Sequence, residues 1–210
     1  MRKWTTKDYR TMPWKNGGGS TTELAIFPEG ASIDHFFWRL STASVAQPGP
    51  FSHFAQIDRT LAILSGDGLV LKRNPSLVNE DIHILQKSSA PFSFFGEDVI
   101  YAELCGGSVL DLNLMTRRDV CQHFMQRLYA GEHAVCFEDA QQVLLYCAQG
   151  SARLADAAEL ATGDLLLLEE EHAQQGISLQ LQADEDSIVY LMRISFLNKF
   201  EPTGAGHGLE

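Results

Sequence analysis

The sequence has no C-x-x-C pair and no H-x-H pair, two short patterns that are typical of redox and metal sites. Four cysteines occur, and their wide spacing favours free thiols in a reducing compartment over a disulfide framework or a zinc site. They are Cys105, Cys121, Cys136 and Cys147. No recognisable nucleophile motif combines a serine or cysteine with a nearby histidine, so nucleophilic catalysis has little support in the sequence.

The chain is also poor in basic residues, with 16 Lys and Arg against 27 Asp and Glu and a net charge of −11. No basic run offsets this balance, which argues against nucleic acid and against an anionic membrane surface as partners. No uncharged apolar run approaches the roughly 20 residues of a membrane span, and residues 1–8 lack the apolar core of a signal peptide. These absences predict a cytoplasmic protein.

What the sequence does contain is a succession of short apolar runs bounded by turn residues, without a 3.6-residue period over three turns. Residues 36–43 alternate, with Phe37, Arg39, Ser41 and Ala43 on one face and Trp38, Leu40 and Thr42 on the other. Further strands are expected at 60–71 with an interruption at Gly66-Asp67-Gly68, and at 81–85, 99–104, 109–115, 143–147, 165–168, 177–181 and 188–194. Residues 120–129 fit either a strand or a short helix. The predicted class is all-β.

The stretch MPWKNGGGST, residues 12–21, contains three consecutive glycines. It is not a P-loop, because Lys15 precedes the glycines and residues 22–27 favour a strand rather than a helix. A glycine turn leading into a strand remains. Trp14, Lys15 and Asn16 can then close the mouth of a cavity, the backbone N–H groups can line an anion site, or the stretch is a plain turn.

Four motifs, in this order, resemble the HutD/Ves family: MPWKNGGGST (12–21), FFWRLSTASVAQPGPFSHF (36–54), DRTLAILSGDGLVL (58–71) and DLNLMTRR (111–118). The rest of the chain is similar more loosely. The resemblance implies a bicupin, two tandem jelly-roll β-barrels, with the first barrel and its glycine turn at 1–115, the second at 116–198 and a loose tail at 199–210. It also implies a bacterial cytoplasmic protein, linked to histidine utilisation in one branch and to stress response in another, without an established catalytic activity.

Most cupins hold a divalent metal through two histidines and a glutamate that precede a glycine at fixed spacing, and this ligand set is missing here. With Gly66 as that glycine, the glutamate position falls on Arg59. The histidine positions fall within residues 52–55, where His53 is the one histidine. The second half of the chain offers no such set either. The sequence therefore predicts neither a metal nor another cofactor.

Arg59 at the glutamate position changes the expected chemistry, because a guanidinium cannot ligate a metal but binds a carboxylate or phosphate through charge-assisted hydrogen bonds. Arg39 is a second arginine able to reach the barrel lumen. The predicted ligand-binding residues are Trp14, Lys15, Asn16, Arg39, Ser41, His53, Arg59 and Asn113. Structural alternatives stay open: Arg59 can pair with Asp58, Asn113 can satisfy neighbouring backbone, and Trp14 can belong to the core.

The first functional hypothesis is a metal-independent bicupin that binds a small carboxylate and acts as a metabolic or stress-linked sensor or regulator. Formylglutamate or urocanate would be the natural ligand in the histidine-utilisation branch, as the resemblance implies. The alternative is a metal-independent isomerase, epimerase or hydrolase that uses acid–base chemistry, for which His53 is the titratable candidate. A third hypothesis is an interaction protein with vestigial pockets. Exposed β-edges would allow a homodimer.

Overall fold

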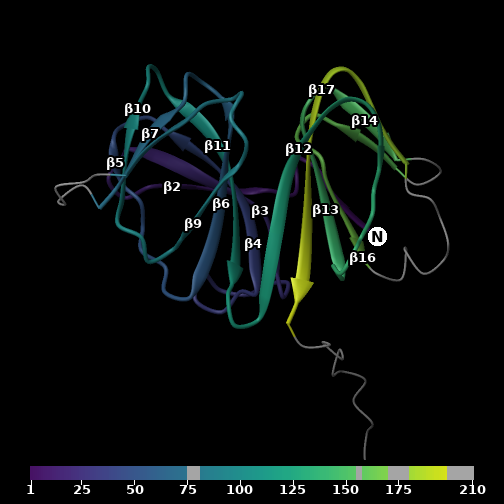
Figure 1. Ribbon diagram of the computed structural model, residues 1–210, viewed down its shortest axis with the longest axis horizontal. Helices are drawn as coiled ribbons and strands as arrows, with labels where there is room; N and C mark the ends of the chain where they lie inside the picture. Colours follow the sequence, from purple (N-terminus) through teal and green to yellow (C-terminus); the bar gives the residue numbers. More distant parts are fainter. Residues whose placement is uncertain (75–80, 155–157, 170–179, 198–210) are drawn as a thin grey trace, which may run out of the picture.

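The computed structural model describes residues 1–74, 81–154, 158–169 and 180–197. Within these ranges every helix or strand is a β-strand, and the strands form three sheets (Figure 1). The all-β prediction is therefore confirmed. The expected tail 199–210, and residues 177–179 of one expected strand, lie outside the described residues. No helix in the described ranges is long and apolar enough to span a membrane.

Residues 10–117 build two of the three sheets. Their strands are β2 (Arg10–Pro13), β3 (Gly19–Phe27), β4 (Trp38–Val45), β5 (Gly49–Pro50), β6 (Ile57–Ser65), β7 (Leu69–Arg73), β8 (Asp81–Leu85), β9 (Phe92–Phe95), β10 (Ile100–Leu104) and β11 (Val109–Arg117). The six-stranded sheet has the order β2-β3-β4-β11-β6-β9, and the four-stranded sheet has the order β5-β10-β7-β8. Neighbouring strands run antiparallel, with β11 held between β4 and β6.

A seven-stranded sheet contains the remaining strands, which are β1 (Arg2–Trp4), β12 (Cys121–Ala134), β13 (Gln142–Gln149), β14 (Ser151–Leu154), β15 (Ala158–Ala161), β16 (Leu165–Glu169) and β17 (Gln180–Phe196). Its order is β1-β16-β13-β17-β14-β15, with β12 paired to β17. The ambiguous residues 120–129 thus fall in a strand, apart from Val120. The long antiparallel pairing with β17 gives the backbone N–H and C=O groups of β12 hydrogen-bond partners. These groups are therefore satisfied in a strand, without the hydrogen bonds of a helix.

Strand β1 departs from the expected division of the chain at residue 115. It pairs with β16, with Arg2 opposite Leu167 and Trp4 opposite Leu165, so it belongs to the sheet built otherwise from residues after 120. The first strand of the chain therefore ties its N-terminus to its second half. A three-residue edge strand has too few side chains for the alternation of apolar and polar residues to predict its pairing partner.

The glycine turn at 66–68 is present, but it is not a hairpin. Gly66 and Gly68 have φ of +91° and +106°, a region that glycine enters without a Cβ penalty. The strands on either side of the turn, β6 and β7, lie in different sheets, so the turn carries the chain from one sheet to the other. Several short strands were not expected from the sequence: β1, β2, β5, β9, β14 and β15.

The predicted alternation is confirmed within β4, but not for Phe37, which precedes the strand and packs against the apolar cluster that contains Trp38. Trp38 and Leu40 pack in an apolar cluster shared with the seven-stranded sheet, whereas Arg39, Ser41 and Ala43 line a cavity on the opposite face. Successive side chains of a strand point to opposite faces, so one strand supplies both an apolar interface and a polar lumen. Strand β11 divides in the same way.

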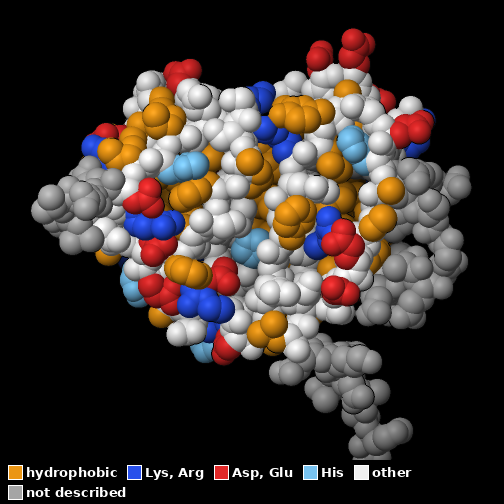
Figure 2. Space-filling view, viewed as in Figure 1, with side chains coloured by type: hydrophobic (Ala, Val, Ile, Leu, Met, Phe, Trp, Pro, Cys, Tyr) orange, Lys and Arg blue, Asp and Glu red, His pale blue; other side chains and the backbone are white. Residues whose placement is uncertain are grey.

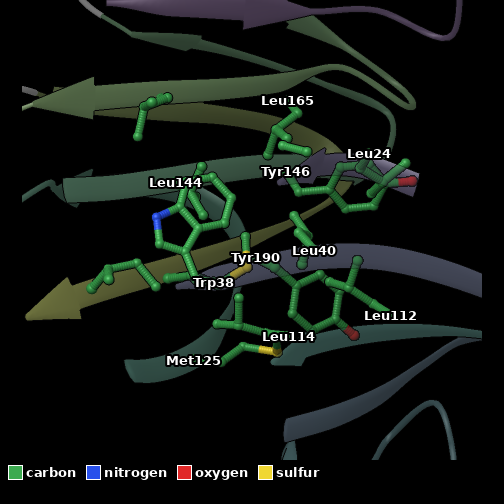
Figure 3. Close-up of a cluster of buried hydrophobic side chains, with 14 of the residues drawn as sticks. Leu24, Trp38, Leu40, Leu112, Leu114, Met125, Leu144, Tyr146, Leu165 and Tyr190 are labelled. Atoms are coloured by element: carbon green, nitrogen blue, oxygen red, sulfur yellow. The ribbon is translucent and has the colours of Figure 1, made fainter. Parts of the chain in front are cut away.

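The largest apolar cluster lies between the six-stranded and seven-stranded sheets (Figure 3). The six-stranded sheet contributes Leu24, Trp38, Leu40, Leu112 and Leu114, and the seven-stranded sheet contributes Met125, Leu144, Tyr146, Leu165 and Tyr190. The indole Nε1 of Trp38 donates a hydrogen bond of 2.7 Å to Oε1 of Gln142, which is itself buried. The two halves of the chain therefore share one core. Each half also has an apolar cluster of its own in its interior.

Candidate functional site

A cavity of about 570 Å³ lies within the first half of the chain. One wall consists of the side chains of β4, β6 and β11 that face away from the apolar interface. Side chains and backbone of residues 13–16, Gly18 and Thr21 from the β2–β3 hairpin, and of residues 47–52 and Phe54, complete it. The second half contains an apolar interior cluster.

Seven of the eight predicted ligand-binding residues line this cavity: Trp14, Lys15, Asn16, Arg39, Ser41, Arg59 and Asn113. The eighth, His53, does not. It is exposed, while its neighbours Ser52 and Phe54 line the cavity. In an extended segment alternate residues face opposite sides, so the titratable group that the motif spacing placed in the lumen at His53 lies outside it.

Arg59 is a buried cation of the cavity that has no carboxylate bound to it among the described residues. It is only 7% exposed, its Nη1 donates to the backbone oxygen of Ser52 at 3.3 Å, and its buried Nε has no hydrogen-bond partner. The rings of Phe51 and Phe94 lie 5.1 and 4.9 Å from its guanidinium carbon. Burial lowers the pKa of Arg59 to about 10, against the attraction of Asp111, so the guanidinium remains charged at neutral pH.

The alternative pairing of Arg59 with Asp58 does not form. Asp58 accepts a 2.7 Å hydrogen bond from Nε of Arg118, whose Nη2 also binds Glu97 at 3.0 Å. Neighbouring residues of a strand face opposite sides, so Asp58 and Arg59 cannot share one environment. Arg59 is consequently left with a free hydrogen-bonding edge inside the cavity.

Arg39 differs from Arg59, because it already has a carboxylate partner. Its Nε donates to Oε2 of Glu23 at 2.8 Å, and its Nη1 lies 3.4 Å from Oγ of Ser41. Glu23 therefore balances the charge of Arg39 within the protein. The uncompensated positive charge of the site comes from Arg59 deep in the cavity and from Lys15 at its rim.

Asp111 is a residue of the site that sequence reasoning did not select. It lies on the same face of β11 as Asn113, is 3% exposed and lines the cavity. Burial raises the pKa of Asp111 to about 7, opposed by the charge of Arg59 and by a hydrogen bond from the backbone of Ala43. Asp111 could have been selected from the sequence, because it lies two positions before Asn113 and residues at this spacing share one face of a strand.

The β2–β3 hairpin forms the rim of the cavity, and its glycines allow close packing. Nε1 of Trp14 donates to Oγ1 of Thr21 at 2.8 Å, and the backbone N–H of Gly18 donates to Oδ1 of Asn16 at 3.0 Å. A Cβ at Gly19 would overlap the backbone oxygen of Ser44 and lie 3.0 Å from the Trp14 ring. The motif is thus a packed turn at the mouth of the cavity.

Replacing Gly19 with alanine is expected to lower the free energy of unfolding by about 1 to 3 kcal/mol, because the added methyl group pushes β3 away from β4. Chemical denaturation measures this loss. Gly107→Ala is the matched control, since a Cβ there meets nothing within 4 Å, and it should change stability by no more than about 0.5 kcal/mol. Equal stability of the two variants would contradict the packing described for the rim.

The cavity does not suit a divalent metal. Its charged side chains are Arg39, Arg59, Lys15 and Asp111, so a cation would meet one carboxylate and three positive groups. In the part of the chain that the structure describes, no group of three His, Cys, Asp or Glu side chains could hold a metal ion. His123 is buried elsewhere, with Nε2 and Nδ1 hydrogen-bonded to Oγ1 of Thr60 and Thr116.

The outer surface carries mixed charge. On the face shown in Figure 2, basic side chains lie beside acidic ones, with apolar side chains between them. Arg118 between Asp58 and Glu97 is an example of such pairing among the described residues. Mixed charge of this kind does not form the continuous basic stripe that a phosphate backbone requires.

These sheets define a cupin-like β protein. The fold superimposes on oxalate decarboxylase from Lactobacillus farciminis with a TM-score of 0.61 at 8% identity, over 94% of this chain and 86% of that chain. The chain belongs to the HutD family, whose model matches residues 6–191.

Relatives agree with this assignment. An uncharacterised 21.2 kDa protein from the hutC 3′ region of Pseudomonas putida is 33% identical over 180 residues, covering 83% of this chain and 90% of that protein. Protein Ves from Citrobacter koseri is 42% identical over 119 residues, covering 55% of this chain. The chain spans 59% of the length of that Ves protein.

Two solved structures resemble the whole chain. A conserved protein of unknown function from Pseudomonas aeruginosa PAO1 has a TM-score of 0.78 at 30% identity, over 92% of this chain and 98% of that chain. HutD from Pseudomonas fluorescens SBW25, solved in a formate condition, has a TM-score of 0.73 at 27% identity, over 94% and 99%. The resemblance to the HutD/Ves family expected from the four motifs is confirmed.

Proposed function

We propose that this protein binds a small carboxylate in the cavity beneath the β2–β3 hairpin, and that it does so without a metal or other cofactor. One observation carries the proposal: Arg59 is 7% exposed, yet its Nε has no partner and no carboxylate forms an ion pair with it among the described residues. A buried charge without a partner is costly, and a ligand carboxylate would remove that cost through charge-assisted hydrogen bonds.

The remaining lining supports a small and partly apolar ligand. Phe51, Phe54 and Met115 supply apolar wall, whereas Asn113 and Lys15 supply polar contacts deep in the cavity and at its rim. A volume of about 570 Å³ is within the range of small-molecule sites, which combine apolar walls with a few placed polar groups.

The broader role is proposed from fold and family. Oxalate decarboxylase and vicilin, which resemble this chain over 94% and 95% of its length, favour an arrangement of two jelly-roll barrels, with residues 116–198 and β1 in the second. The relative from the hutC 3′ region supports a link to histidine utilisation, and a role as a metabolic or stress-linked sensor or regulator is proposed from the family resemblance. A cytoplasmic location, and a homodimer formed through exposed strand edges, belong to the same proposal.

Thermal unfolding against formate, acetate, glutarate, formylglutamate, urocanate and divalent cations tests the binding site. A carboxylate at about 100 times its Kd is expected to add about 2.7 kcal/mol and to raise Tm by a few degrees. Arg59→Met, which keeps the length of the side chain, should lose this gain. Arg73→Met is the control, since Arg73 pairs with Asp81 and Asp98 outside the cavity.

The outcomes separate the proposals. If a carboxylate raises Tm equally in Arg59→Met and in the parent protein, Arg59 is not part of the binding site. A shift with divalent cations alone would overturn the metal-independent assignment. Sodium chloride at matched ionic strength controls for nonspecific stabilisation by salt.

A second candidate function is an acid–base enzyme, and Asp111 is the observation that favours it. A carboxyl group whose pKa is about 7, placed in a cavity beside a cation, is suited to general acid–base catalysis. Turnover of a cavity ligand that disappears in Asp111→Asn while binding persists would establish this activity. Binding without turnover across the panel would leave the sensor role.

A further inference from the structure

Two buried groups of opposite charge share the cavity without touching. Asp111 on β11 and Arg59 on β6 are 3% and 7% exposed, and no ion pair joins them. Oδ1 of Asp111 and Nε of Arg59 are both buried atoms without a hydrogen-bond partner in the described chain. Each group therefore has bonding capacity that the protein itself leaves unused.

Three basic side chains line the cavity together with Asp111, and each comes from a different element. Arg59 faces Asp111 from β6, and Arg39 lies on β4 with its charge balanced by Glu23 of β3. Lys15 lies at the rim and is exposed. Asn113, the other polar group of β11 in the cavity, is neutral. Arg59 is thus the one deeply buried cation without a carboxylate bound to it in the described cavity.

A ligand carboxylate that binds Arg59 enters the same small space as Asp111. Two ionised carboxylates around one guanidinium, both removed from water, repel each other and cannot both be balanced by a single positive charge. The repulsion ends when one carboxyl group takes up a proton. Paired carboxyl groups in a shared site titrate in this coupled way.

On the basis of the function proposed above, we propose that Asp111 is a ligand-binding residue that acts in its protonated form, so that a carboxylate and one proton enter the cavity together. The proton comes from solvent and stays on the Asp111 carboxyl group. Its O–H can then donate a hydrogen bond, and the added proton removes the repulsion between the two carboxyl groups. Burial has already raised the pKa of Asp111 to about 7, so this protonation is accessible near neutral pH.

The affinity of the cavity for a carboxylate would therefore depend on the protonation state of Asp111. Asp111 would weaken binding of any carboxylate at alkaline pH, even though the ligand itself is fully ionised there. Arg59 alone would bind a carboxylate with constant affinity across the same range, because its guanidinium remains charged.

Formate is the probe, since it is ionised throughout pH 6 to 9. Its Kd is measured by fluorescence, for which Trp14 at the cavity provides the signal, and by shifts in Tm. In the parent protein Kd should rise about tenfold between pH 8 and pH 9, as uptake of one proton requires. In Asp111→Asn the Kd should be independent of pH. His53→Gln, which changes an exposed histidine outside the cavity, should keep the slope of the parent.

A calorimetric titration of the parent protein at pH 8, in triethanolamine and in Tris buffer, counts the protons directly and does not depend on whether a variant folds. About one proton taken up per formate supports the proposal. Formate binding that depends on Arg59 but shows neither proton uptake nor a pH slope would overturn it and leave the proposed carboxylate site standing. Absence of formate binding at every pH would overturn both.

Discussion

Replacing Trp38 with alanine is expected to lower the free energy of unfolding by about 3 to 5 kcal/mol. Trp38 is 1% exposed and lies in the cluster that joins the six-stranded and seven-stranded sheets. Its ring stacks on Phe27 with centroids 5.9 Å apart, and its Nε1 donates to Gln142. Alanine would leave a cavity at the junction of the two halves and a buried amide oxygen without its donor.

Urea denaturation followed by circular dichroism measures this loss. Trp38→Phe isolates the hydrogen bond, and combining it with Gln142→Leu should recover part of the loss, because the orphaned oxygen is then removed. Phe124→Ala is the control, since Phe124 is 50% exposed and its loss should cost about 0.5 kcal/mol or less. A loss below about 1 kcal/mol in Trp38→Ala would contradict a core shared between the two halves.

Asp111→Asn is expected to be more stable than the parent protein at pH 8, by up to about 4 kcal/mol. The folded protein holds the pKa of Asp111 at about 7, above its ordinary value of 3.8, because the group is buried. Between these values the folded state binds more protons than the unfolded state. The stabilisation is therefore present below about pH 4 and is lost as the pH rises through about 7. Asparagine resembles the neutral acid and avoids this loss.

His123 acts in the opposite direction. Burial lowers its pKa from 6.5 to about 4, so its contribution to stability is present above about pH 6.5 and is lost as the pH falls through about 4. Between about pH 4 and 6.5 the two groups oppose each other in the parent protein. Asp111→Asn should expose the His123 slope, a rise of about 3 kcal/mol across that window.

Free energies of unfolding from pH 4 to 9, measured for the parent protein, Asp111→Asn and His123→Gln, check both effects. The parent protein should lose stability between about pH 6.5 and 8, where Asp111 titrates without opposition from His123. Identical pH profiles for the parent protein and Asp111→Asn would show that Asp111 is not buried as an acid, which would also weaken its proposed part in ligand binding.

The sequence by itself determined the all-β class and the faces of the central strands. Alternation placed Arg39 and Ser41 on one side of β4 and Trp38 on the other, because side-chain direction in a strand follows a local period of two. The same rule placed Asn113 in the lumen. The four motifs also predicted the family.

Only the tertiary structure decided which groups share the cavity and how their charges are balanced. Asp58 pairs with Arg118, which lies far along the chain, and no carboxylate pairs with Arg59 among the described residues. Glu23 from a neighbouring strand balances Arg39, and the fold buries Asp111 beside Arg59. Ion pairing, burial and desolvation depend on which strands, remote in the sequence, become neighbours in space. Local sequence patterns do not determine these neighbours.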